Sequence, residues 1–371
     1  MRFRDIIGQE GVKQQLRLSV QDQRIAHARL LAGKEGVGKL PLAIAYAQYI
    51  NCPNRTAEDS CGVCPTCLQF GQLQHPDLHF AFPIVKGDRG DTCNDFMDKF
   101  REIVLEKQYF SLDDWYRKLE VETKQGMIYE KESQEMLRKL SLKPFGNGYK
   151  VMIIWQPEKM NAVCANKLLK LLEEPPEKTL FLLVSEHPDQ LLPTILSRVQ
   201  FTRVPDLTET ELSEHVSADI AHIAMGSYLT AIRLQQNDEQ RQMFMTDFIA
   251  LMRHAWMVGH ARKYDSLLEM RRFSLEIADA KVGREKQKAF LQYAQQQVRE
   301  NYIRRFSQPQ MNYQTAEEAA FSEKFCPYIN EGNVEQIMRE LEKAEQQISQ
   351  NGNAKIIFFD LCLQLIVLIK K

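Results

Sequence analysis

Residues 33–39, with the sequence GKEGVGK, restrict the fold of this chain more than any other segment. They have the spacing of a phosphate-binding loop, in which a glycine is followed by four residues, a second glycine and a lysine. A short apolar stretch, 28–32, precedes the segment, and a helix-like stretch follows it as far as residue 50. A loop of this kind connects a strand to a helix, and we therefore expect an α/β core around it.

The candidate nucleotide-binding residues in this loop are Gly33, Gly36, Gly38 and Lys39. Backbone N–H groups of such a loop point at phosphate oxygens, the start of the following helix adds partial positive charge, and Lys39 would reach the β- and γ-phosphates. The alternative is a glycine-rich turn without a ligand. The sequence leaves ATP or ADP binding at this loop open.

The residues that would hold magnesium are missing. The motif places Ser or Thr after the lysine, where the hydroxyl binds Mg²⁺, and this chain has Leu40. A second ligand is normally an Asp at the end of a core strand, but the strand candidate 149–155 ends in Trp155 and Gln156. We therefore predict no bound magnesium and no intrinsic ATPase activity. An active nucleotide-driven motor, with its metal held by a residue such as Glu158, is the alternative.

Four of the eight cysteines, Cys52, Cys61, Cys64 and Cys67, lie close together in the sequence. In a reducing compartment this clustering favours a metal over disulfides. Four thiolates close a tetrahedral Zn²⁺ site and leave no position open for catalysis, so we predict a structural zinc module at 52–67. An iron–sulfur cluster and four unliganded buried cysteines are the alternatives.

Short apolar runs in the first half of the chain indicate further strands of the same sheet. Residues 149–155 and 179–185 are largely apolar strand candidates, residues 77–84 are a strand candidate that alternates polar and apolar residues, and residues 161–174 have helical periodicity. Short runs without alternation suit parallel strands that are buried on both faces. The sequence therefore predicts a parallel-sheet core over residues 1–205.

The rest of the predicted organisation is an insertion and two helical regions. Residues from about 86 to 126 carry mixed charges and aromatics without a clear register, and we interpret them as an insertion on the core. Residues 208–225 are predicted to form one helix, which Gly226 ends before a second short helix, giving a small lid at 206–236. Residues 237–371 are predicted to be all-helical.

The charge balance argues against a chain that binds nucleic acid over its whole surface. Lys and Arg total 48 against 49 Asp and Glu, so any contact with DNA must come from a local patch. A third hypothesis makes the cysteine module a sequence-independent DNA-binding element. Its single cation, Arg55, is opposed by Glu58 and Asp59, which is poor chemistry for phosphates.

Nothing in the sequence indicates a membrane protein. The N-terminal residues are charged where a signal peptide needs an apolar stretch. The most apolar segment, 356–369, contains Asp360 and Gln364 and is too short to cross a bilayer, so we expect a buried helix there. We predict a cytoplasmic protein.

Several segments, in this order along the chain, resemble the ATPase-type subunits of bacterial clamp loaders, which belong to the AAA+ proteins. They are IIGQE at 6–10, His27-Ala28, the loop at 33–39, the cysteine module, LLKLLEEPP at 168–176 and LPTILSRV at 192–199. The last is similar to the family's Ser-Arg-Cys segment, with Val199 in the place of the cysteine. The resemblance covers residues 3–235 and implies a RecA-like AAA+ core at 1–205, a helical lid and a C-terminal collar domain.

This family contains motor subunits, called gamma or tau, and a non-hydrolysing kind called delta-prime. Leu40, Trp155 and Gln156 favour the second kind. Motor subunits also carry an arginine in the short helix after a Gly-Ser break, and the stretch here, GSYLTA at 226–231, has none. Arg198 is retained, and the resemblance implies that it reaches in trans into the ATP of a neighbouring subunit as an arginine finger. Out of that context, Arg198 would be a surface arginine in a weak ion pair.

The resemblance implies a hetero-pentameric ring of DNA polymerase III that loads a sliding clamp onto primed DNA. The expected partners of this chain are the gamma or tau motor subunits and delta, with the clamp and the DNA reached through the complex. The helical domain at 237–371 would join a collar of similar domains. The chain itself would be a subunit without enzymatic activity of its own.

Overall fold

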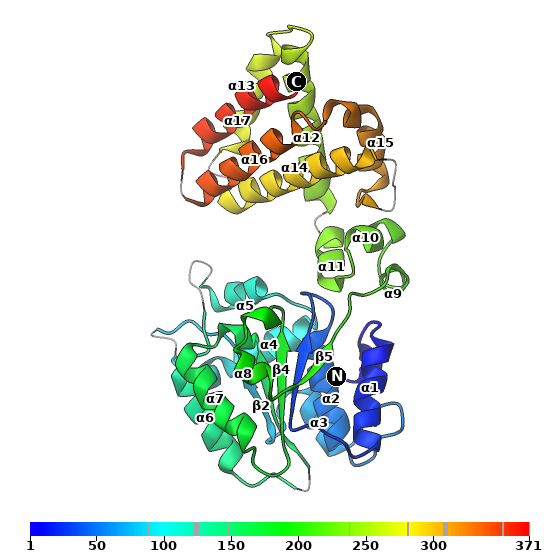
Figure 1. Cartoon of the computed structure of the whole chain (residues 1–371), viewed down its shortest axis with the longest axis vertical. Coiled ribbons are helices and arrows are strands. Elements are labelled where there is room, and N and C mark those ends of the chain that lie inside the picture. The colour runs from blue at the N-terminus through cyan, green and yellow to red at the C-terminus, as the bar shows by residue number, and fades with distance from the viewer. Residues whose placement is uncertain are drawn as a thin grey trace. The chain divides into compact units, whose positions relative to one another are not determined.

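The computed structural model of the chain describes residues 1–87, 90–121, 126–146, 148–236, 238–279, 282–306, 311–350 and 352–370. The chain forms two compact units, Met1–Ile232 and Arg233–Lys371 (Figure 1). The first contains a sheet between helices, and the described residues of the second form helices joined by turns and loops, without a strand. The predicted α/β parallel-sheet core, followed by a helical C-terminal region, is confirmed.

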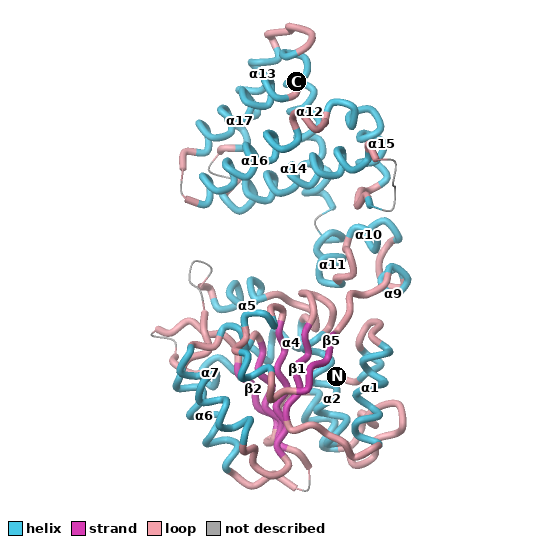
Figure 2. The backbone as a smooth tube through the Cα atoms, viewed as in Figure 1, coloured by secondary structure: helices cyan, strands magenta, loops and turns pink. Residues whose placement is uncertain are grey.

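The sheet of the first unit has five strands in the order β2-β3-β4-β1-β5, and every neighbouring pair is parallel (Figure 2). The strands are β1 (Ala28–Ala32), β2 (Leu78–Ala81), β3 (Lys150–Trp155), β4 (Thr179–Ser185) and β5 (Gln200–Arg203). Every residue of β1, β3 and β4 is buried, because helices cover both faces of the sheet. This double burial explains why these strands appear in the sequence as continuous apolar runs.

Helices lie on both sides of the sheet, with α1, α2 and α3 on one side and α6 and α7 on the other (Figure 1). Their bounds are α1 (Glu10–Gln21), α2 (Lys39–Asn51), α3 (Pro65–Gly71), α6 (Glu130–Ser141) and α7 (Ala162–Glu173), and the short α8 (Pro193–Leu196) precedes β5. Helix α2 buries its residues from Lys39 to Ile50 on every face. A helix that is apolar all round belongs in the interior, so the segment after the phosphate-binding loop is fixed inside the core.

The predicted insertion folds into helices that pack on the carboxyl end of the sheet. It contains α4 (Met97–Glu106) and α5 (Leu112–Leu119). The Phe100 ring stacks on Phe82 with 4.0 Å between centroids, and Trp115 is fully buried against both rings. The Trp115 indole Nε1 donates a hydrogen bond to the Pro83 carbonyl at 2.7 Å, which ties the insertion to the residues after β2.

The lid consists of three short helices, α9 (Glu209–Ser213), α10 (Ala218–Ile223) and α11 (Tyr228–Gln236). The single helix predicted at 208–225 is wrong. Thr208 caps α9 by accepting the Glu211 N–H, and Ser217 leaves the helical conformation, with φ −63° and ψ 152°, to become the N-cap of α10. Ser and Thr favour such cap positions over a helix interior, which explains the break.

The second unit is a bundle of helices: α12 (Asp238–Gly259), α13 (Ser266–Ile277), α14 (Arg284–Arg304), α15 (Ala316–Phe325), α16 (Val334–Ser349) and α17 (Ala354–Leu368). Helix α17 covers most of the segment 356–369 and buries one face in the core of this unit. Its opposite face leaves Ile356 and Val367 exposed, so the helix is only half buried. Within the described residues, no helix is both long and apolar enough to cross a membrane.

Trp115→Ala should lower the free energy of unfolding by about 3–5 kcal/mol, because a large buried ring is removed. Trp115→Phe should lower the free energy of unfolding less, by about 1–3 kcal/mol, since an aromatic ring stays in the cluster while the bond to the Pro83 carbonyl and part of the ring volume are lost. Urea unfolding followed by circular dichroism measures both variants. Phe145→Ala is the matched control, because that side chain is exposed. Equal stabilities for Trp115→Ala and the control would contradict this role for Trp115.

Candidate functional site

The phosphate-binding loop lies between β1 and α2, as its sequence predicts. Gly36 and Gly38 have φ angles of 78° and 91°, in the left-handed region that favours glycine. A Cβ on Gly33 would lie 2.3 Å from the Val204 carbonyl oxygen, so no side chain fits there. Gly38 is the N-cap of α2, and Lys39 is the first residue of that helix. The structure therefore brings the four predicted loop residues together in the geometry of an anion-binding loop.

The Lys39 side chain is buried and already has partners within this unit. Only 5% of it is exposed, and its ammonium group donates to the Lys34 carbonyl. The ammonium also lies 3.8 Å from a carboxylate oxygen of Glu186. Burial lowers the pKa of Lys39, while the negative charges of Glu186 and Glu158 oppose that shift. The lysine that would bind phosphate thus faces carboxylates of its own chain.

Glu186 was not predicted as a site residue. It follows β4, and its backbone N–H donates to Glu158 Oε1 at 3.0 Å. The same Glu158 oxygen accepts the His187 N–H at 3.2 Å, so Glu158 fixes the turn after β4. Glu158 Oε2 is buried without a hydrogen-bond partner among the described residues. The only signal in the sequence is that both glutamates follow core strands, whose carboxyl ends meet at one edge of the sheet.

The positions of the missing magnesium ligands are filled by buried side chains. Leu40 and Trp155 are 5% and 3% exposed. The Trp155 ring lies against Phe110 and Phe100, with centroids 5.0 and 5.8 Å apart. Gln156 is buried and has a φ of 57°, which is unusual for a residue other than glycine. An apolar surface therefore occupies the edge of the sheet where a metal ligand is expected.

The lid and the insertion cover the loop. The Tyr228 N–H, at the start of α11, donates to the Gly36 carbonyl at 3.1 Å. Tyr109, from the insertion, lies so near Gly38 that a Cβ there would be 3.3 Å from its ring. The Tyr109 hydroxyl accepts the Ile7 N–H at 3.1 Å, and burial raises the pKa of Tyr109 to about 12. Sequence patterns did not identify Tyr109, because its neighbours in space come from distant segments.

The four clustered cysteines converge on one point. Their ligand atoms all lie within 4.8 Å of one another, and Cys61 and Cys67 are 3.8 Å apart at Sγ. Three of the sulfurs accept a backbone N–H at 3.4 Å: Cys52 from Cys61, Cys61 from Cys64, and Cys64 from Cys67. N–H donors of Val63 and Cys64 lower the pKa of Cys61 to about 6, whereas burial raises the pKa of Cys52 and of Cys67 in the absence of a metal charge. Four close sulfurs, supported by N–H donors that stabilise thiolates, fit a metal such as zinc.

Arg198 lies at the surface of the first unit, just after α8. One guanidinium nitrogen is 2.7 Å from a carboxylate oxygen of Glu173, at the end of α7. Another donates to the Thr194 carbonyl at 2.8 Å. The side chain is one third exposed. Arg198 is therefore held in a defined orientation and is partly exposed.

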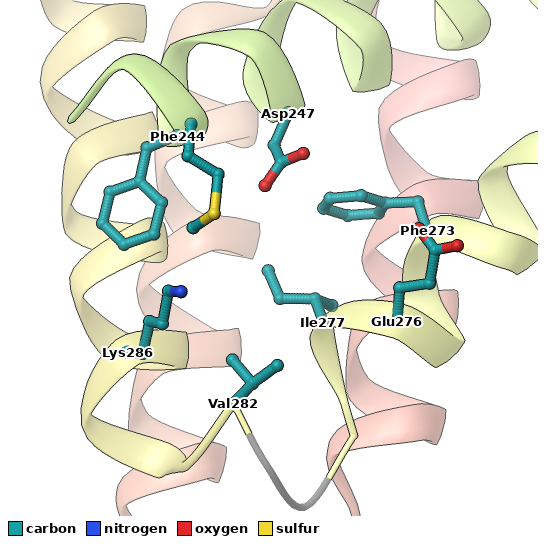
Figure 3. Close-up of a pocket in the computed structure, with 8 residues that line it drawn as sticks. Phe244, Asp247, Phe273, Glu276, Ile277, Val282 and Lys286 are labelled. Atoms are coloured by element: carbon teal, nitrogen blue, oxygen red, sulfur yellow. The ribbon is translucent and has the colours of Figure 1, made fainter. Parts of the chain in front are cut away.

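A separate pocket of about 230 Å³ lies in the second unit and contains none of the predicted site residues (Figure 3). Its walls are mostly apolar, with Phe244 and Phe273 on opposite sides. Burial raises the pKa of Asp247 at its edge. No ion pair joins Asp247 to Lys286 within the described part of the unit. The volume is below the range of about 300–1,000 Å³ that ligand pockets usually have, so we do not regard it as a cofactor site.

The sequence model of a protein family described as "DNA polymerase III, delta subunit" matches residues 8–208. The DNA polymerase III subunit tau/gamma of Haemophilus influenzae is 29% identical over 60% of this chain and 26% of its own length. The DNA polymerase III subunit delta' of Bacillus subtilis is 29% identical over 60% of this chain and 57% of its own length. This chain therefore spans less than two thirds of both relatives.

Two solved structures are similar over nearly the whole chain. One is a DNA polymerase III gamma subunit-related protein of Thermotoga maritima, with 14% identity, 96% of this chain and 99% of that chain covered, and a TM-score of 0.44. The other is the Bacillus subtilis DNA clamp loader delta protein, with 11% identity, 97% and 100% covered, and a TM-score of 0.33.

Metal analysis of the purified protein should give one zinc per chain, and Cys64→Ser should remove it because a closed site loses one of four ligands. Hydrogen exchange should then rise first in the module around 52–67, since metal binding there supplies local folding energy. Cys326→Ser, outside the cluster, is the control and should keep its zinc. Iron in place of zinc, or a full zinc content in Cys64→Ser, would rule out the assignment.

Proposed function

This chain belongs to the DNA polymerase III delta subunit family, and from that membership we propose that it is the non-hydrolysing delta-prime subunit of a clamp loader. The observation that carries the proposal is the replacement of both magnesium anchors by buried apolar side chains, Leu40 and Trp155. Phosphoryl transfer in loops of this type depends on a metal ion that neutralises charge on the phosphates. Relatives of both the tau/gamma and the delta' kind match the chain. The choice of the delta-prime subunit over a motor subunit therefore rests on the site residues Leu40 and Trp155.

The buried setting of Trp155 argues against an active motor with an unusual metal site. Trp155 packs between aromatic rings of the insertion, so no ligand for a metal is available there. Glu158, the alternative ligand, uses one oxygen to accept the N–H groups of Glu186 and His187. A carboxylate that holds the backbone of a turn is a structural anchor. Because Glu158 Oε2 has no hydrogen-bond partner among the described residues, the support for the non-hydrolysing function over the motor function comes from the buried Trp155.

Arg198 is the residue through which such a subunit would act on ATP. Phosphoryl transfer spreads negative charge over the γ-phosphate oxygens, and a guanidinium brought from a neighbouring chain would stabilise that charge. Arg198 is one third exposed and its bonds to Glu173 and Thr194 lie at the surface of the unit, so a neighbouring chain can reach it, which supports a role in trans. Because a docked neighbour is needed to complete the site, ATP turnover would depend on assembly.

The proposed partners are those that the family resemblance implies: gamma or tau motor subunits and delta in a hetero-pentamer, with the sliding clamp and primed DNA. One feature of the second unit supports assembly. Helix α17 exposes a row of apolar side chains on the face opposite its buried one: Ile356, Phe359, Leu363 and Val367. An exposed apolar row of this kind is typical of a surface that is covered in a complex, as a collar of C-terminal domains requires.

The isolated chain should show no ATPase activity at saturating ATP and Mg²⁺, because Leu40 and Trp155 replace the two metal anchors together. A phosphate-release assay measures this directly. Turnover above background that Lys39→Ala abolishes would overturn the non-hydrolysing function. Activity that survives Lys39→Ala would instead indicate a contaminating ATPase.

In a reconstituted ring, Arg198→Ala in this chain alone should reduce turnover at the neighbouring site by about 10³–10⁵-fold, which is the usual contribution of an arginine finger. The ring should still assemble, as measured by gel filtration. Arg198→Lys should rescue poorly, because an ammonium cannot reproduce the planar guanidinium. Arg24→Ala, which changes an exposed arginine elsewhere in the unit, is the control. A ring with Arg198→Ala that loads clamps and hydrolyses ATP like the wild type would show that Arg198 is an ordinary surface residue.

A further inference from the structure

The two glycines that shape the phosphate-binding loop are both covered by side chains of this chain. At Gly36, an added Cβ would lie 2.2 Å from the Ser227 hydroxyl and 2.8 Å from Leu229 Cβ, at the start of α11. At Gly38, the nearest atoms belong to the Tyr109 ring, at 3.3 Å. Glycines open such a loop so that its backbone can approach phosphates. Here side chains of the lid and the insertion pack directly on both glycines.

Tyr109 is held in this place from several directions. Its ring meets the Tyr228 ring edge-on, with 4.9 Å between centroids, and its hydroxyl accepts the Ile7 N–H. The next residue, Phe110, packs on Trp155 at the end of β3. Because the ring is 8% exposed and contacts the N-terminal segment, the loop and the lid, it cannot move without breaking these contacts.

The charge that would attract a phosphate is also compensated. The Lys39 ammonium donates to the Lys34 carbonyl and lies 3.8 Å from Glu186. To reach Lys39, the phosphates of a nucleotide would have to displace the Glu186 carboxylate. Their negative charge would then lie close to the negative charges of Glu186 and Glu158. Like charges at short range in a buried site disfavour binding strongly.

We propose that the insertion is an internal plug of the nucleotide cleft: Tyr109 fills the space between the loop and the lid, and Glu186 takes the place of a phosphate as the counter-ion of Lys39. The plug excludes nucleoside diphosphates and triphosphates from the loop. The inference rests on the proposed non-hydrolysing function and extends it, because a chain without catalytic residues could still bind nucleotide. It also gives the insertion a function, which its sequence did not reveal.

The test is a titration of the full chain with ADP, with and without Mg²⁺, by calorimetry and by the thermal shift of the first unit. The variants are Tyr109→Ala, Glu186→Ala and the double change. Tyr109→Phe is the control for the ring, since it keeps the volume and loses only the hydroxyl. Glu177→Ala is the control for charge, because Glu177 is exposed. Circular dichroism and zinc content establish that each variant is folded.

The wild type and both controls should show no binding at millimolar ADP. Each single alanine variant should bind ADP at least about tenfold more tightly than the wild type, and the double variant most tightly. ADP should also raise the melting temperature of Glu186→Ala, because its phosphates replace the missing counter-ion of a buried lysine. The same ligand should leave the melting temperature of the wild type unchanged.

Two results would overturn the plug. One is a wild-type chain that binds ADP as tightly as the double variant, and the other is a folded double variant that binds no better than the wild type. Either result leaves the non-hydrolysing function intact if the wild type still lacks ATPase activity. ATP hydrolysis by the wild type would overturn both proposals, so the two failures are distinguishable.

Discussion

The contact on which the first unit depends is the packing of Trp155 against Phe100 and Phe110. Trp155 ends β3, next to the central strand β4, at the carboxyl edge where loops of α/β sheets usually hold their ligands. Its ring joins this edge to the insertion, and Trp115 extends the cluster to the residues after β2. An ionised carboxylate at this position would be buried among aromatic rings at a high desolvation cost. The same packing therefore fixes the insertion and removes a metal ligand.

The sequence predicted most reliably those features that are encoded locally. The runs at 28–32 and 179–185 coincide with β1 and β4, because central parallel strands are buried on both faces and need apolar residues at every position. The cysteine cluster was predicted from spacing alone, since its four ligands come from one short segment. In contrast, β5 was missed, because this edge strand exposes Gln200, Phe201 and Arg203 and has no apolar run.

The features that the sequence did not reveal depend on contacts between distant segments. Glu186 and Lys39 meet only because β4 lies beside β1 in the sheet, and no periodicity links them. Tyr109 lies between two short helices, α4 and α5, in a stretch of mixed composition that gave no clear helical pattern. The lid was predicted as one helix because apolar spacing continues through Ser217, where a cap ends the pattern. The sequence therefore did not predict which distant residues meet, even where it predicted the type of each element correctly.

Lys39 and Arg198, two cations of the first unit, differ in their exposure to solvent, and this difference links the structure to the proposed function. Lys39 is buried, and a carboxylate of the same chain compensates its charge. Arg198 is one third exposed, and its guanidinium contacts Glu173 and the Thr194 carbonyl at the surface of the unit. Both cations are paired with a carboxylate of the chain, so they differ in exposure: only Arg198 can meet an anion of a neighbouring molecule without a rearrangement of the core. This difference in exposure supports the proposal that the chain acts on ATP bound by a partner rather than on ATP of its own.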